Sequence, residues 1–165
     1  MKTKRGQIQI SFGMIFSIII IIAILAVGAY IIIHFMSLSD CTTAGLFYKD
    51  LQKTVDEAWA APASKSVMTD TLPSSVQYVC FGTLTQVARS TDAQRKSDLM
   101  DSYKFSKTEN AFMYPAGGAC KGDTGKIVIN HAQTDLFFCQ KVEGGQIKVI
   151  ITKGSTDALA KIQPA

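Results

Sequence analysis

Hydrophobic residues are concentrated in one long segment near the N-terminus. From residue 6 to residue 39 the chain contains no Asp, Glu, Lys or Arg, and residues 12–33 are almost entirely apolar. A bilayer core of about 30 Å is crossed by roughly 20 helical residues at 1.5 Å each. The pattern therefore predicts one transmembrane helix over residues 12–35, preceded by a short N-terminal segment, residues 1–11.

A polar segment after this helix predicts that it ends and that a second helix begins. Residues 37–40, Ser-Leu-Ser-Asp, are typical of helix N-caps. From about Thr42 to Ala60 apolar residues recur at helical spacing, and Pro62 ends the pattern. We expect the apolar stripe of the second helix to dock on a sheet. The stripe consists of Phe47, Leu51, Val55, Ala58 and Trp59.

Shorter segments rich in β-branched and aromatic residues follow and predict strands. These segments are residues 76–81, 111–114, 126–130, 136–142 and 147–152. Gly144-Gly145 predicts a hairpin between the last two.

Two further segments complete the predicted fold. Residues 91–103 are polar and predict a short exposed helix, with Thr91 and Gln94 as a capping box. Residues 154–165 either add a helical turn or fray. The predicted fold class is α+β: a transmembrane helix, then a second helix and a small antiparallel β-sheet head within one domain, residues 36–165.

Charge placement predicts the orientation of the chain. Lys2, Lys4 and Arg5 precede the apolar segment, so the positive-inside rule puts the N-terminus in the cytoplasm and the domain of residues 36–165 outside it, anchored in the cell membrane. The net charge is +4, and without these three residues it falls to about +1. Such a balance offers no basic stripe, so we expect no nucleic-acid partner.

Four cysteines, Cys41, Cys80, Cys120 and Cys139, all follow the apolar segment. An even number of cysteines in an extracytoplasmic domain predicts two disulfides, for which three connectivities exist. We favour Cys41–Cys80 and Cys120–Cys139 because each pair lies within a locally connected unit. A zinc site and redox catalysis are weaker alternatives, since no CxxC motif occurs.

Motifs for catalysis or cofactor binding are not found. The expected extracytoplasmic domain has a single histidine, His131, with Asp135 four residues later, and no GxSxG motif exposes a serine. The Gly-rich segment 115–125 leads into Lys126, but it lacks the spacing of a phosphate-binding loop. We expect no enzyme activity, no cofactor and no metal, and we expect His131 to lie in a turn or at a sheet edge.

Lys4-Arg5-Gly6-Gln7 stands directly before the apolar segment, whereas an ordinary secretory signal has its cleavage site after a shorter one. This arrangement resembles the archaeal class III signal peptides of type IV pilin-like proteins. The resemblance covers residues 2–35. It implies cleavage between Gly6 and Gln7 with the apolar helix retained, and a long N-terminal helix capped by a small β-rich head.

The sequence departs from the pilin pattern at one position. These pilins usually carry a glutamate at the fifth mature residue, where this chain has Ser11, and no acidic residue occurs before Asp40. We therefore predict a non-enzymatic, pilin-like, membrane-anchored protein that serves surface assembly or interaction, with the lipid bilayer and a possible homo-oligomer as partners, and leave filament formation open. The alternative is a tethered ligand- or protein-binding module with an uncleaved signal anchor.

Overall fold

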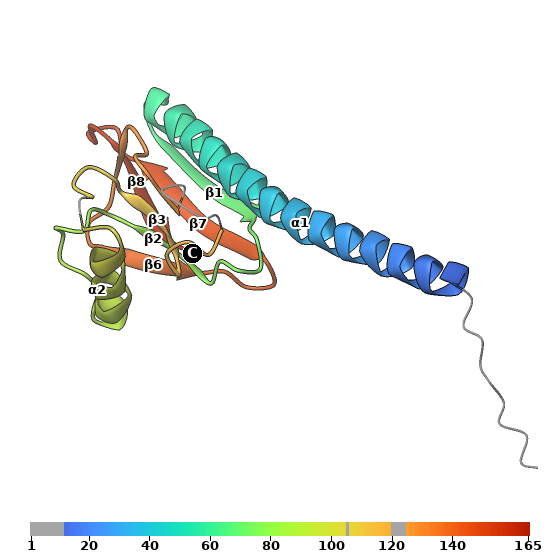
Figure 1. The fold of residues 1–165 in the computed structure, drawn as a ribbon. Coiled ribbons are helices and arrows are strands. Elements are labelled where there is room, and N and C mark those ends of the chain that lie inside the picture. The colour runs from blue at the N-terminus through green and yellow to red at the C-terminus, as the bar shows by residue number, and fades with distance from the viewer. Residues whose placement is uncertain (1–11, 105, 120–124) are drawn as a thin grey trace, which may run out of the picture. The chain divides into compact units, whose positions relative to one another are not determined.

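The computed structural model describes residues 12–104, 106–119 and 125–165. The chain divides into two compact units, residues 1–37 and 38–165. The fold is α+β, as the sequence predicts, with one long N-terminal apolar helix and mostly antiparallel strands (Figure 1).

Helix α1 runs without interruption from Phe12 to Ala60. The predicted break at residues 37–40, with a separate second helix behind it, is therefore wrong. The hydroxyls of Thr42 and Thr43 donate to the carbonyls four residues earlier, at 3.1 and 3.0 Å, instead of starting a new helix. Back-bonding of this kind lets hydroxyl side chains remain inside a helix.

The predicted apolar stripe on the second half of α1 is buried, with one exception. The side chains of Phe47, Leu51, Val55 and Ala58 are at most 4% exposed. Trp59 lies at the end of the stripe and is 41% exposed, so its expected burial is wrong. Its indole Nε1 donates to the carbonyl of Ala158 at 3.1 Å, which orients the ring at the surface.

Within the described residues, eight strands form two four-stranded sheets rather than the one small sheet expected. Sheet A has the order β1-β7-β8-β5, and sheet B has the order β4-β3-β2-β6. All neighbours are antiparallel except β5 and β8, which are parallel. The strands are β1 (Ser64–Thr71), β2 (Tyr78–Phe81), β3 (Ala111–Tyr114), β4 (Lys126–Ile127), β5 (Ala132–Gln133), β6 (Phe138–Lys141), β7 (Gln146–Lys153) and β8 (Ala160–Pro164).

Sheet A contains three strands that the sequence did not predict. Strand β1 is mostly polar, and it forms because all of its residues pair in register with β7. Strand β8 replaces the expected helical turn or fraying tail, and its Ala160 and Ile162 alternate into the core. Strand β5 is only two residues long.

Sheet B lies between two hydrophobic clusters. Val79, Phe81 and Met113 belong to the main core, which also holds the buried stripe of α1 and the inward side of sheet A. Their strand neighbours Cys80 and Phe112 face the opposite way, into a smaller cluster. This alternation follows from the two-residue period of a strand.

The smaller cluster is closed by α2 (Ala93–Ser102), which follows a single 3₁₀ turn, Ser90–Asp92. The predicted helix over residues 91–103 thus exists, but it is not merely a surface element because Leu99 is fully buried. The predicted capping box is wrong: Asp92 is the N-cap residue, and Gln94 instead donates to Asp98 at 2.9 Å.

Candidate functional site

The first half of α1 presents large apolar side chains to its surroundings. These side chains are between 41% and 71% exposed, and they cover residues 14–35 with few interruptions. The helix is long and apolar enough to cross a membrane. A helix that is apolar around its circumference is unfavourable in water and suits a lipid environment. The predicted processing junction, Gly6-Gln7, lies outside the described residues.

The predicted disulfide connectivity is wrong. Cys80 bonds to Cys139, which excludes both favoured pairs, Cys41–Cys80 and Cys120–Cys139. The physical reason is that β2 and β6 are neighbours in sheet B, where Cys80 and Cys139 stand directly opposite each other. Cys41 is also disulfide-bonded, and Cys120 lies outside the described residues.

A buried carboxylate supports the sheet beside this disulfide. Asp92 is 4% exposed, and its Oδ1 accepts from Arg95 at 2.8 Å while its Oδ2 accepts from the backbone N–H of Cys139 at 3.2 Å. The Arg95 guanidinium also stacks over the Tyr78 ring, 3.8 Å from its centre. Because each group in this network has a partner, we assign it a structural role in joining α2 to sheet B.

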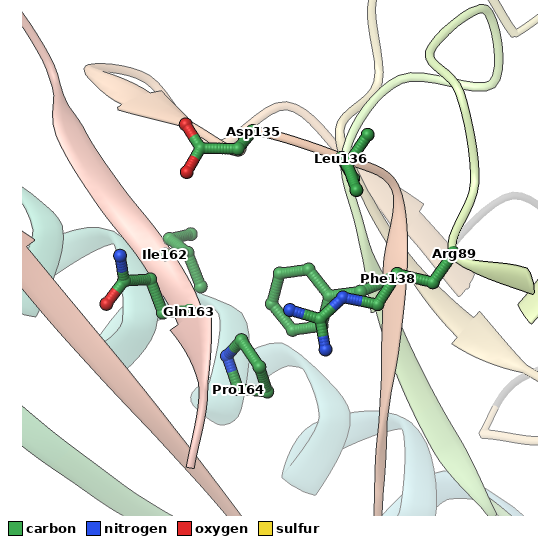
Figure 2. A pocket seen from close by; sticks show the side chains of 7 residues that line it. All are labelled: Arg89, Asp135, Leu136, Phe138, Ile162, Gln163 and Pro164. Atoms are coloured by element: carbon green, nitrogen blue, oxygen red, sulfur yellow. The ribbon is translucent and has the colours of Figure 1, made fainter. Parts of the chain in front are cut away.

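A hollow of about 400 Å³ lies between β8 and the segment that leads into β6. Figure 2 shows Phe138, Ile162 and Pro164 lining it, with Arg89 at one side and Asp135 at the other. The Arg89 guanidinium lies over the Phe138 ring, 5.2 Å from its centre. The hollow thus combines an apolar floor with opposite charges at its rim.

His131 lies in a turn, as predicted, but its partners come from α1. Its ring stacks on Trp59 at a centroid distance of 3.8 Å, and its Nδ1 lies 2.9 Å from Asp56 Oδ1. Asp56 also accepts from Gln52 at 2.9 Å. The backbone of His131 has φ 59°, a left-handed conformation that is uncommon for a residue with a side chain. The stack and the hydrogen bond hold the residue there.

Two titratable side chains beside the Gly-rich segment, Glu109 and Tyr48, have pKa values far from their usual ones. Ser106, the backbone near Glu109 and Lys126 hydrogen-bond to the Glu109 carboxylate and lower its pKa to about 2. Burial raises the pKa of Tyr48, whose hydroxyl donates to the carbonyl of Gly125 at 3.1 Å. Both therefore stay in one protonation state near neutral pH. They fix the chain at Gly125 and Lys126, at the end of the segment, of which residues 120–124 lie outside the described residues.

The remaining acidic residues that we considered for chemistry are dispersed. Asp135 lies 3.8 Å from Lys161 rather than beside His131, and Asp98 accepts from the hydroxyl of Tyr114 at 2.8 Å. Within residues 12–104, 106–119 and 125–165, no three His, Cys, Asp or Glu side chains gather as ligands for a metal ion.

Sequence reasoning did not identify the hollow or the Trp59–His131 stack. Arg89 and Asp135 are separated by 45 intervening residues, and only the tertiary fold brings them to one rim. No local sequence pattern linked Asp56 and Trp59 of α1 to His131. No protein-family model matches the chain, and comparisons with curated proteins and with solved structures find no match.

Proposed function

We propose that this chain is a non-enzymatic, single-pass membrane protein of pilin-like construction, whose domain of residues 36–165 serves surface assembly or interaction outside the cytoplasm. The observation that carries the proposal is the first half of α1, with exposed apolar side chains over residues 14–35. Exposure of these side chains to water is unfavourable, whereas transfer into a bilayer removes them from water and is favourable.

Two further observations support the extracytoplasmic location. The three basic residues Lys2, Lys4 and Arg5 precede the apolar segment, as the positive-inside rule requires. Cys41, Cys80 and Cys139 are all disulfide-bonded, and structural disulfides persist in oxidising compartments. Both observations favour an outer location for the domain of residues 36–165.

The membrane anchor is tested by putting charge into the middle of the apolar segment. We expect the unaltered chain to resist alkaline carbonate extraction, and the double variant Ile20→Lys/Ile24→Lys to move to the soluble fraction. Each lysine at the centre of a span opposes insertion by about 2.5–3.5 kcal/mol. The control is Val67→Lys at an exposed position of β1, which should remain in the membrane. Retention of the double variant in the membrane would refute the anchor.

Pilin-like processing is decided by the mature N-terminus. Mass spectrometry of protein from its native membrane should find Gln7 as the first residue, and replacing Gly6 with Asp should leave the precursor uncut. An intact Met1 in the unaltered chain would instead favour the alternative, a tethered binding module with an uncleaved anchor. The hollow beside Arg89 favours that second candidate because it is of ligand-binding size. Electron microscopy of cell surfaces then separates a filament from a dispersed protein.

A further inference from the structure

The hollow between β8 and β6 carries its two rim charges on opposite sides. Arg89 lies at the β6 side, over the ring of Phe138, and Asp135 lies at the side of β8 (Figure 2). Leu136 lies at the rim as well and is 43% exposed. The hollow is therefore lined by apolar side chains together with Gln163, and it carries a positive charge on Arg89 and a negative charge on Asp135.

Neither rim charge has an ion-pair partner closer than 3.8 Å in the described part of the chain. Arg89 has no ion-pair partner among the described residues, although stacking on Phe138 holds its guanidinium in place. Asp135 is 74% exposed and only approaches Lys161 at 3.8 Å, which is a loose surface pair. A stacked guanidinium keeps its N–H groups available for a carboxylate.

The rim also exposes apolar surface that the fold leaves uncovered. Val87 is 73% exposed, and its carbonyl accepts from the backbone N–H of Phe137, which places it beside Leu136. Leu136 and the half-buried Pro164 line the hollow, and Val87 adds exposed apolar surface next to Leu136. A cluster of this kind next to an available arginine is typical of the centre of a protein–protein interface.

We propose that this surface is a two-fold interface between two copies of the chain. In a two-fold contact the symmetry axis lies in the interface. A residue on one side of this axis in one copy therefore meets the residue that lies on the other side of the axis in the second copy. An axis midway between Arg89 and Asp135 therefore brings Arg89 of each copy against Asp135 of the other. Leu136 and Pro164 of the two copies then close the two hollows against each other.

The charge pattern favours a second copy over other occupants. An anionic lipid or a wholly acidic peptide would be attracted by Arg89 but repelled by Asp135. A second copy satisfies both charges at once because the surface is complementary to itself. The proposal extends the assembly role proposed above by naming the partner and the surface, but dimerisation through this surface does not depend on the membrane anchor.

The test uses reversed charges in the full chain, purified in detergent micelles, with self-association measured by sedimentation. Arg89→Glu places a glutamate against Asp135 of the second copy, and Asp135→Arg places an arginine against its Arg89. We expect each variant alone to associate at least about tenfold more weakly than the unaltered chain, because like charges then face each other twice. The matched control is Lys65→Glu, which reverses an exposed charge on β1, away from the hollow.

Mixing the two variants gives the decisive measurement. In a mixed dimer the introduced glutamate of one copy faces the introduced arginine of the other, and the unaltered Asp135 faces the unaltered Arg89. Both contacts are then attractive again, so the mixture should dimerise as the unaltered chain does. Circular dichroism and an intact Cys80–Cys139 disulfide show that each variant is folded.

Three outcomes would each overturn the interface. They are failure of the folded mixture to dimerise, dimers that are unaffected by Arg89→Glu, and an unaltered chain that is monomeric. None of these outcomes alters the carbonate-extraction result, which tests the anchor separately.

Discussion

His131 illustrates how single residues hold the surface of residues 38–165 in place. Its backbone has φ 59°, a conformation that disfavours a side chain by about 1–2 kcal/mol. Its ring stacks on Trp59 and approaches Asp56 at 2.9 Å, and an aromatic stack contributes roughly 0.5–1.5 kcal/mol. The two effects are of similar size and opposite sign, so the ring is what makes this backbone conformation acceptable.

Two substitutions separate the two effects. His131→Ala removes the ring and keeps a side chain that the backbone disfavours, whereas His131→Gly removes the ring and relieves the backbone. We expect the alanine variant to have an unfolding free energy about 1 kcal/mol lower than the glycine variant. Urea titration, followed by the fluorescence of Trp59, the only tryptophan of the chain, measures both. Equal stability of the two variants would mean that the left-handed conformation is not retained in solution.

At the scale of elements, α1 combines two surfaces with different surroundings. Its first half exposes apolar side chains over residues 14–35, and its second half buries the stripe that includes Leu51. Leu46 lies on the same second half and is 53% exposed. Two leucines on one helix therefore occupy opposite environments, which makes them a matched pair.

Truncating these leucines measures how strongly the second half of α1 is packed. Leu51→Ala should lower the unfolding free energy of the domain by about 2–5 kcal/mol, because it leaves a cavity in the main core. Leu46→Ala should change it by less than about 0.5 kcal/mol, because its side chain is already exposed. Thermal unfolding in micelles, monitored by circular dichroism, gives both values. Similar losses for the two variants would show that α1 does not dock through this stripe.

The sequence predicted the helices and strands better than it predicted which of them pair or pack together. The stripe of α1 was found because burial on one side imposes a helical period that is visible locally, and strands such as β3 and β7 were found because they are rich in aromatic or β-branched residues. Strand β1 was missed because its residues are mostly polar and become a strand only through pairing with β7. The break at residues 37–40 was wrongly predicted because Ser and Asp are typical of helix N-caps, whereas α1 continues through them and the hydroxyls of Thr42 and Thr43 bond back inside it. Cysteine spacing could not show that β2 and β6 are neighbours.

At the scale of the whole molecule, the disulfide between Cys80 and Cys139 joins distant parts of the chain. The Cys80–Cys139 disulfide has a sequence separation of 59 and joins the centre of sheet B to its edge strand. In the chain-entropy model a loop of this length contributes about 4 kcal/mol by restricting the unfolded state. The disulfide therefore adds stability on the scale of the whole domain.

Removing this link should weaken the domain without changing its fold. The double variant Cys80→Ser/Cys139→Ser should lower the unfolding free energy by about 2–4 kcal/mol, measured by urea titration. Asp92 and α2 still cover the site, so the circular dichroism spectrum before unfolding should be unchanged. A matched double substitution at exposed positions, Ser97→Ala/Ser102→Ala on α2, controls for surface effects. A chain that loses no stability would show that its unfolded state is already compact.

The same link has a mechanical consequence. A force that pulls the end of α1 away from β8 passes through the disulfide between Cys80 and Cys139. The residues between these two cysteines therefore bear none of the force and are not stretched. About 200 Å of contour length, at roughly 3.4 Å for each of 59 residues, is thus withheld from stretching. Strand β3 and helix α2 lie inside this protected loop. Under tension this loop stays closed, and a reductant would release it.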